Sequence, residues 1–288
     1  MRRTIVSAIG LLLGTAAFAQ QQGEMNGPPK VLVIAREVVK TGQSAAHEKW
    51  EMGWPQAFTK ANWPVHYIAA TALTGESRAL FITGYDSEEA WEKDNHAQAK
   101  DPGLKAQLDA LAAKDADYLK ESATSVFNYM PEISYHADVP IATMRYFRIA
   151  AIEVKPGHND HFVEVRKLIR AAHEKANLGD HYAVYHRSAG GSGGLYLIFV
   201  PMKSLAENDQ FAAIHGDAYK AALGEDGQKK VAEFGAQGAE SMETQIFEFS
   251  PKMSYPPQAF LDMNPDFWTV KPAVAKKPVK QAAKQAAK

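Results

Sequence analysis

The feature that most constrains the fold is a pattern that occurs twice in the sequence. In each copy an apolar, β-branched run ends at a Lys-x-Gly turn, and a helical pattern follows at once. The first copy is Val39–Gly42 and the second is Val154–Gly157, at an offset of 115 residues. Glycine and proline end regular structure because glycine accepts turn conformations and proline lacks a backbone donor. The repetition predicts two copies of one supersecondary unit.

The spacing of apolar residues predicts the same order of elements in both halves. In the first half we expect strands at 30–39, 65–73, 79–85 and 125–130, and helices at 43–61 and 86–120, the first capped by Ser44 and kinked or shortened by Pro55. In the second half we expect strands at 144–154, 182–187, 195–200 and 244–249, and helices at 159–177, 204–223 and 228–238. Both halves therefore follow the order β-α-β-β-α-β.

Short residue matches in the same order support a duplication. They are His66-Tyr67 with His181-Tyr182, Leu80–Ile82 with Leu195–Leu197 and Asp94 with Asp209 at an offset of 115, and Ser134-Tyr135 with Ser254-Tyr255 at an offset of 120. The change of offset predicts five extra residues in the second half, most simply in the loop 224–227.

A β-α-β-β-α-β unit is an antiparallel sheet with both helices on one face. The bare face must be buried, and two units in one chain can bury theirs against each other. In this topology, and in the strand–Lys-x-Gly–helix openings, residues 30–255 resemble the dimeric α+β barrel superfamily, which includes antibiotic-biosynthesis monooxygenase-like, NIPSNAP-like and EthD-like proteins. The resemblance implies an α+β fold of two tandem ferredoxin-like units packed sheet to sheet in one chain. It implies little about function, because this architecture hosts many activities.

The chain divides into seven segments by composition. Residues 1–19 have a charged start at Arg2-Arg3, an apolar run and an Ala17–Ala19 cleavage motif, which together predict a secretory signal peptide; the alternative, a membrane anchor, would need a longer apolar run. We expect a linker at 20–29, the first unit at 30–137, a linker at 138–143 and the second unit at 144–256. An arm at 257–270 and a disordered Lys/Ala/Pro tail at 271–288 follow.

Charge and cysteine usage exclude several classes of function. The net charge is -1, but the last eighteen residues carry six lysines and no acid, so residues 4–270 are acidic at about -9. An acidic body is a poor nucleic-acid binder. The absence of cysteine excludes disulfides, thiolate metal sites and a cysteine nucleophile. The lysine tail has two interpretations, contact with anionic envelope surfaces or simple solubilisation.

The best candidates for chemistry are two His-Tyr pairs, His66-Tyr67 and His181-Tyr182, each at the start of a second strand. A neutral imidazole and a phenol provide a general base and a hydrogen-bond donor. Adjacent strand residues point to opposite faces, however, and the favoured alternative is a structural role for both pairs.

Trp50, Trp54 and Trp63 gather along the first helix and its exit. They are candidate ligand-binding residues, since aromatic side chains often line small-molecule pockets. The favoured alternative is that they form core between helix and sheet.

No metal site is assigned from the sequence. His158 and His161 have a spacing that places both on one side of a helix, but no third ligand is fixed near them. We predict no cofactor, with haem as a minor option. The segment 188–194 is glycine-rich, but it lacks the features of a phosphate-binding loop and predicts a flexible hairpin.

Several charged residues interrupt apolar strands, and they face either solvent or a polar cavity between the sheets. They are Arg36, Glu37, Arg148, Glu153, His186 and Arg187. Together these patterns predict an exported, periplasmic or secreted protein that does not span the membrane and forms a pseudo-dimer within one chain. Its expected role is small-molecule binding or scaffolding. The alternative is a cofactor-independent oxygenase or isomerase that uses His66 or His181 as base and Tyr67 or Tyr182 as donor.

Overall fold

The structure, a computed structural model, describes residues 27–270. The predicted signal peptide, most of the first linker and the lysine tail lie outside the described residues. The first half contains β1 (Val31–Val39), α1 (Ser44–Glu51), α2 (Gly53–Ala61), β2 (Tyr67–Ala72), β3 (Arg78–Tyr85), α3 (Glu88–Lys100), α4 (Pro102–Asp115) and β4 (Leu119–Tyr129). The second contains β5 (Tyr146–Val154), α5 (Asn159–Ala176), β6 (Ala183–Ala189), β7 (Leu195–Met202), α6 (Ala206–Ile214), α7 (Asp217–Glu233), the π-helix η3 (Phe234–Gly238) and β8 (Ala239–Phe249).

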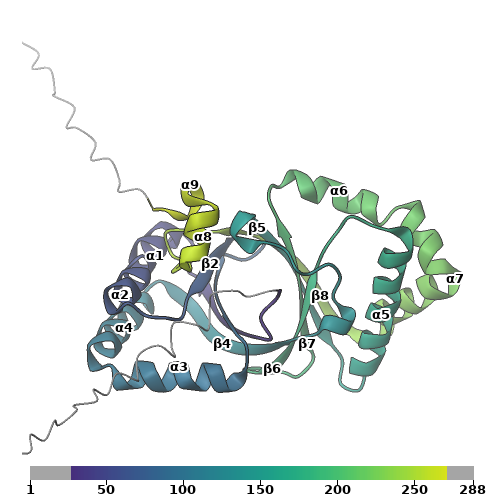
Figure 1. Ribbon diagram of the computed structural model, residues 1–288. Helices are drawn as coiled ribbons and strands as arrows, with labels where there is room; N and C mark the ends of the chain where they lie inside the picture. The colour runs from purple at the N-terminus through teal and green to yellow at the C-terminus, as the bar shows by residue number, and fades with distance from the viewer. Residues whose placement is uncertain (1–26, 271–288) are drawn as a thin grey trace, which may run out of the picture.

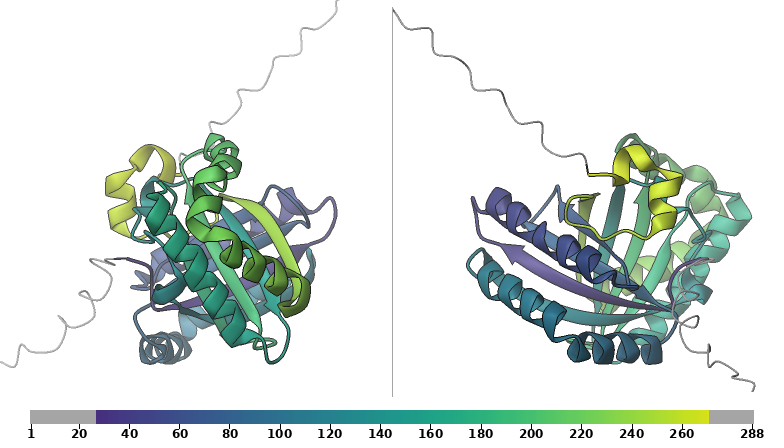
Figure 2. Two further views of the ribbon diagram at one scale, coloured as in Figure 1. Left: turned by 90° about the vertical axis from the view of Figure 1, so that its right-hand side faces the viewer. Right: turned by 60° about the vertical axis from the view of Figure 1, so that its left-hand side comes forward.

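The eight strands form one closed antiparallel barrel in the order β1-β3-β2-β8-β5-β7-β6-β4. Each half contributes four consecutive strands, and the halves join edge to edge where β2 pairs with β8 and β4 pairs with β6. Closure leaves no free sheet edge. Helices α1–α4 cover the outside of one half of the barrel, and α5 and α7 cover the other (Figures 1 and 2). The predicted α+β barrel is confirmed.

Strand register corrects the alignment of the two halves. Ile34 pairs with Ile82, and Ile149, its counterpart 115 residues later, pairs with Phe199. Phe199 therefore corresponds to Ile82 at an offset of 117, and the predicted match of the third strands is two residues out of register. Two of the five extra residues lie in the β6–β7 hairpin, and three lie between β7 and β8. The predicted loop at 224–227 is wrong, because α7 runs through it with a kink at Gly224, where φ is 71°.

The Ser-Tyr repeat links the two halves in a reciprocal way. Ser134, just after the first half, accepts a hydrogen bond from the backbone N–H of Val184 in the second. Ser254, just after the second half, accepts one from the N–H of Ala69 in the first. The distances are 2.9 and 2.8 Å, and both serines are buried. The serine repeat thus has a structural role, because each serine satisfies a backbone donor that burial removes from water.

The barrel interior is filled by apolar side chains from all eight strands except at its two ends. These residues include Leu32, Ile34, Leu80, Ile82, Phe127, Phe147, Ile149, Tyr185, Phe199, Phe247 and Phe249. Alternate residues of each strand face this core, as period-two side-chain geometry requires. The intervening residues face the helices.

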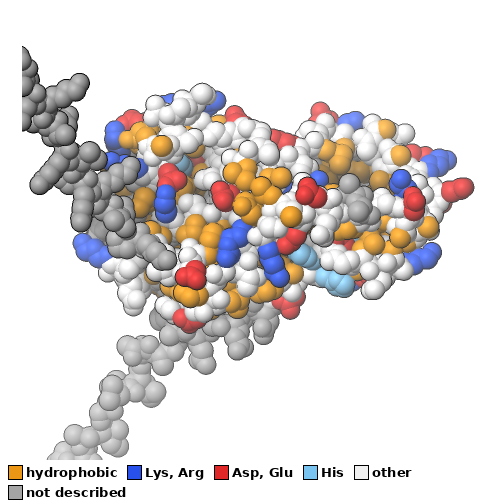
Figure 3. All heavy atoms as spheres, turned by 90° about the horizontal axis from the view of Figure 1, so that it is seen from above, with side chains coloured by type: hydrophobic (Ala, Val, Ile, Leu, Met, Phe, Trp, Pro, Cys, Tyr) orange, Lys and Arg blue, Asp and Glu red, His pale blue; other side chains and the backbone are white. Residues whose placement is uncertain are grey.

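The segment after the second half packs over one end of the barrel through α8 (Gln258–Met263) and α9 (Pro265–Trp268). Trp268 is buried and donates its indole N–H to the carbonyl oxygen of Ala142 at 2.8 Å. The Arg145 guanidinium lies 3.9 Å from the centre of the Phe267 ring. On this side of the molecule hydrophobic side chains lie at the surface between charged ones (Figure 3).

Of two local expectations in the first helical region, one is confirmed and one is corrected. The predicted kink occurs as a break at Met52 between α1 and α2, which leaves Pro55 in the first turn of α2, where proline is tolerated. Ser44 is the first residue of α1 and makes no capping bond, since Gln43 occupies the N-cap. Within residues 27–270, no helix has both the length and the apolar character needed to cross a bilayer.

Candidate functional site

A cavity of about 450 Å³ lies at the end of the barrel that the C-terminal arm covers. Its walls are mostly apolar and come from the barrel interior, the linker between the halves and the arm. They include Leu32, Ile68, Ile82, Phe147, Tyr185, Phe199, Ile141, Phe260 and Met263. Cavities of this size and character hold small molecules in other proteins.

His66 and His181 both border this cavity, and they occupy matching positions in the two halves of the chain. The ring of His66 stacks on Tyr255 with centroids 4.4 Å apart, and its Nδ1 is buried without a partner. Burial lowers the pKa of His66, so its ring is neutral near pH 7. His181 instead donates its Nε2 proton to the carbonyl oxygen of Pro201 at 2.7 Å. The two histidines are therefore not equivalent in chemistry, because His66 alone of the pair keeps a buried nitrogen without a partner.

The two tyrosines lie against the helices. Tyr67 packs against Phe58 of α2, and Tyr182 packs against Tyr135 and beneath the guanidinium of Arg166. Both hydroxyls are buried without a hydrogen-bond partner, and burial raises the pKa of both phenols. The structure thus brings all four predicted residues to the border of the barrel cavity, next to the starts of β2 and β6, but the imidazole and the phenol of each pair make separate contacts.

A second group of polar side chains lies between β1, α1 and α4, where sequence analysis placed no site. Glu37, His47, Glu51 and Asp115 each offer one ligand atom, and these four atoms lie within 4.8 Å of one another. His47 Nε2 is 2.9 Å from a Glu37 oxygen and 3.7 Å from an Asp115 oxygen. We call these four residues the acid–His cluster.

Three residues of the acid–His cluster are buried, and the side chain of the fourth, Glu37, is 13% exposed. His47 and Glu51 are each 2% exposed, and Asp115 is 3% exposed. Burial raises the pKa of Glu51 to about 9, and the neighbouring charges of Glu37 and Asp115 add to the shift. Burial, followed by the charge of Glu37, also raises the pKa of Asp115 to about 6. Carboxylates placed this close in a dry site cannot all stay ionised without a counter-charge.

The three tryptophans occupy the same helical layer and do not line the barrel cavity. Trp50 donates its indole N–H to the carbonyl oxygen of Leu111 at 2.9 Å. Trp63 donates to the buried carboxylate of Asp94 at 2.8 Å and borders a wider groove next to the arm. The indole nitrogen of Trp54 is buried without a partner. Asp94 has no buried counterpart at its predicted match in the second half, since Asp209 is exposed.

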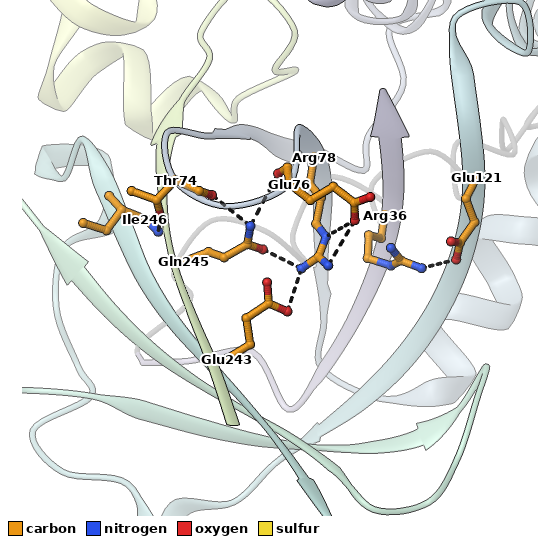
Figure 4. Close-up of polar contacts among 8 residues, drawn as sticks. All are labelled: Arg36, Thr74, Glu76, Arg78, Glu121, Glu243, Gln245 and Ile246. Atoms are coloured by element: carbon orange, nitrogen blue, oxygen red, sulfur yellow. Dashed lines mark hydrogen bonds and ion pairs between the residues drawn. The ribbon is translucent and has the colours of Figure 1, made fainter. Parts of the chain in front are cut away.

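The other end of the barrel is polar, and its charges pair with one another (Figure 4). Arg36 pairs with Glu121, and Arg78 pairs with Glu243 at 3.1 Å and also contacts Gln245. Ion pairs this exposed contribute about 0–1 kcal/mol each. They close the interior at this end with polar groups.

The remaining charged strand residues divide between the two faces of the sheet. Glu153 and Arg187 share the interior face and lie 3.5 Å apart. Arg148 faces outward, with its guanidinium 3.8 Å from the centre of the Phe211 ring, and His186 stacks on Tyr196. The charged strand residues thus serve several separate contacts and do not form one polar cavity.

His173 is the histidine with the geometry nearest to that of a haem ligand. Its Nδ1 bonds to Asp180 at 2.9 Å, and its Nε2 is buried without a partner. The rings of Tyr135, Tyr182, His215 and Tyr219 surround it with centroids 5.2–5.5 Å away. His173 is therefore enclosed by aromatic side chains, and haem stays a minor prediction. His158 and His161, the other histidine pair, have ring centroids 6.2 Å apart.

No known family profile matches the chain, and no curated protein matches it. Solved structures do match. A candidate monooxygenase from Fusobacterium nucleatum has 12% identity and a TM-score of 0.50, with 77% of this chain and 93% of that chain covered. An anthrone oxidase-like protein has 12% identity and a TM-score of 0.48, with coverage of 76% and 91%. A chlorite dismutase variant from Candidatus Nitrospira defluvii has 10% identity and a TM-score of 0.45, with coverage of 82% and 95%.

The chain has the dimeric α+β barrel fold. At 12% identity the likeness shows the fold alone, and it assigns neither an activity nor a site. The predicted resemblance is confirmed at the level of the fold. The barrel cavity and the acid–His cluster remain the two places in the described chain where chemistry or binding can be argued from this protein's own residues.

Proposed function

We propose that this is an exported small-molecule-binding protein built from two tandem ferredoxin-like units, and that the barrel cavity holds its ligand. The observation that supports the proposal is the cavity itself, about 450 Å³ in volume and lined mostly by apolar side chains. A ligand there would be apolar or aromatic, with one group that hydrogen-bonds to His66. Export to the periplasm or medium is proposed from the N-terminal sequence alone.

The composition of the cavity wall supports an apolar ligand. Filling a cavity lined by Leu, Ile and Phe with an apolar molecule restores dispersion contacts that an empty cavity lacks. The C-terminal arm would help to keep a ligand in the cavity. Phe260 and Met263 of the arm border the cavity, and the buried Trp268 anchors the arm to the barrel. The arm and residues 137–142 therefore cover part of the cavity.

The test combines native mass spectrometry with a variant that fills the cavity. Mass spectrometry of the full exported protein should show a copurifying small molecule. Ala183→Leu adds volume inside the cavity and should abolish this species, whereas Ala110→Leu on the exposed face of α4 should not. A ligand that remains bound to Ala183→Leu would contradict the location. Absence of any ligand, together with no saturable binding of an apolar fluorescent probe, would contradict the function.

A second candidate function is cofactor-independent oxygenase or isomerase chemistry on a small organic substrate. The observation that favours it is the unpartnered, neutral Nδ1 of His66 at the cavity wall, which is a suitable proton acceptor. His66→Ala would then abolish turnover of the copurifying molecule and keep its binding. If His181→Ala unfolds and His66→Ala stays folded, then His181 has a structural role that His66 lacks. If both variants stay folded and keep all turnover, the enzymatic candidate is rejected.

A further inference from the structure

We propose that the acid–His cluster is a binding site for one divalent transition-metal ion of the kind that prefers mixed nitrogen and oxygen ligands, such as Mn²⁺ or Zn²⁺. Glu37 of β1, His47 and Glu51 of α1, and Asp115 of α4 would supply one ligand atom each. This inference is independent of the barrel cavity, since none of the four residues lines it.

The backbone places the four ligands around one point. His47 and Glu51 are four residues apart on α1, so both side chains project from the same face of the helix. Glu37 projects from the helix-facing side of β1, and Asp115 is the last residue of α4. The four ligand atoms lie within 4.8 Å of one another. Atoms bound to one metal at about 2.0–2.2 Å lie at most about 4.4 Å apart, so a small contraction of the four side chains completes the site.

The cluster also contains buried carboxyl oxygens that a proton satisfies in the metal-free protein and that a cation can satisfy in its place. Glu51 Oε1 and Asp115 Oδ1 are buried and have no hydrogen-bond partner. Within residues 27–270, no lysine or arginine forms an ion pair with Glu37, Glu51 or Asp115. Three carboxyl groups therefore converge on one imidazole, and an unpartnered buried acceptor costs free energy. A divalent ion would supply both the missing partner and the missing charge.

The ligand types indicate the class of metal. Carboxylates suit hard cations such as Mg²⁺, Ca²⁺ and Mn²⁺, whereas imidazole suits Zn²⁺, Fe²⁺ and similar ions. The mixture of three carboxylates with one imidazole selects ions that accept both. Four protein ligands in a largely buried site are typical of a structural metal, which here would join β1, α1 and α4.

The second half gives an internal reference for this assignment. At an offset of 115 residues, Ile152 replaces Glu37, Phe162 replaces His47 and Arg166 replaces Glu51. Phe234 packs on Phe162 with ring centroids 5.4 Å apart, where Asp115 lies beside His47 in the first half. The same architecture thus forms with aromatic side chains and one arginine in this layer, so the fold does not require three carboxyl groups here.

The experiment measures metal binding by the full mature chain. The protein is stripped with EDTA, both as native protein and during refolding, because the ligands are buried. Mn²⁺ and Zn²⁺ are then titrated separately, bound metal is counted by plasma mass spectrometry and the Tm is recorded. We expect one bound equivalent of at least one of the two ions and a higher Tm.

Two ligand variants and one control make the result specific. Glu51→Gln and Asp115→Asn keep the shape of the side chain, so they should fold, with a metal-free Tm equal to or above that of the wild type. They should bind metal at least about tenfold more weakly, since loss of even an outer-shell partner costs about 10–100-fold. The double variant His158→Ala/His161→Ala should bind as the wild type does. Absence of stoichiometric metal in the wild type, unchanged binding by both ligand variants, or loss of binding in the control would each overturn the assignment.

Discussion

The two halves of the barrel use the same space between sheet and helices in opposite ways. In the first half this layer holds the acid–His cluster, which contains three carboxyl groups and one imidazole. In the second half it holds an aromatic core of Phe162, Tyr196 and Phe234. The two halves have the same arrangement of strands and helices, but the side chains between sheet and helices are polar in one half and mainly aromatic in the other. The difference shows that one half can bury a polar cluster, which lowers the free energy of unfolding, while the aromatic core of the other half raises it.

The largest expected loss of stability follows from removing an aromatic side chain from the core of the second half. Phe162 is 1% exposed and packs on Tyr196 with ring centroids 4.1 Å apart. Phe162→Ala should lower the free energy of unfolding by about 3–5 kcal/mol, because it leaves a cavity in a dense core. Urea denaturation followed by circular dichroism checks this value. A loss below about 1 kcal/mol would mean that the two halves do not differ in core packing.

A smaller and symmetric effect is expected at the serines that link the halves. Ser134→Ala and Ser254→Ala each leave a buried backbone N–H unpaired, at Val184 and Ala69 respectively. Each should lower the free energy of unfolding by about 1–3 kcal/mol. The same denaturation measurement tests whether the two losses agree. Unequal losses would show that the halves depend on each other unequally.

The acid–His cluster should make the metal-free protein sensitive to pH. The folded state raises the pKa of Glu51 from 4.5 to about 9, so the folded chain binds a proton that the unfolded chain releases. The contribution of Glu51 to stability therefore falls as pH rises from about 4.5 to about 9. In EDTA, Glu51→Gln should become more stable than the wild type by an amount that grows with pH over this window.

Thermal unfolding at several pH values provides the measurement for Glu51. The aromatic layer of the second half supplies the control, since Phe162→Leu should shift the Tm by the same amount at every pH. A difference between Glu51→Gln and the wild type that does not change with pH would contradict a neutral, buried Glu51.

The smallest effect is expected at the polar end of the barrel. Glu121 is 56% exposed at its side chain and pairs with Arg36, which is 34% exposed. Glu121→Gln should change the free energy of unfolding by about 0–1 kcal/mol, and salt should reduce the change further. Denaturation at low and high ionic strength measures it. A loss of several kcal/mol would indicate that this end of the barrel is as tightly packed as the other.

Much of the fold could be predicted from sequence because the relevant signals are local. The Lys-x-Gly turns at Val39–Gly42 and Val154–Gly157 marked the first strand–helix junction of each half, and the alternation of apolar residues located all eight strands. The length of β4 and β8 was underestimated, since both begin about five residues before their apolar segments. Pairing with β1 and β5 extends them, and such pairing is invisible in a local pattern.

The candidate site was less predictable. Glu37 was noticed as a charge inside an apolar strand, and His47 and Glu51 have the four-residue spacing of one helix face. Asp115 carries no such signal, because nothing in the local pattern distinguishes it from Asp109 in the same helix or from Asp117 just after it. No rule of spacing joins residues 37 and 115, since their proximity arises from the packing of α4 against α1 and the sheet.

The sequence by itself determined the α+β class and the order of strands and helices, and it predicted a duplicated unit, since turn chemistry and the period of apolar residues are properties of neighbouring residues. Only the tertiary structure decided how the halves close through β2–β8 and β4–β6, and which buried groups then meet. The physical reason is distance along the chain. Side chains more than sixty residues apart, such as His47 and Asp115, influence each other only after the barrel has removed them from water.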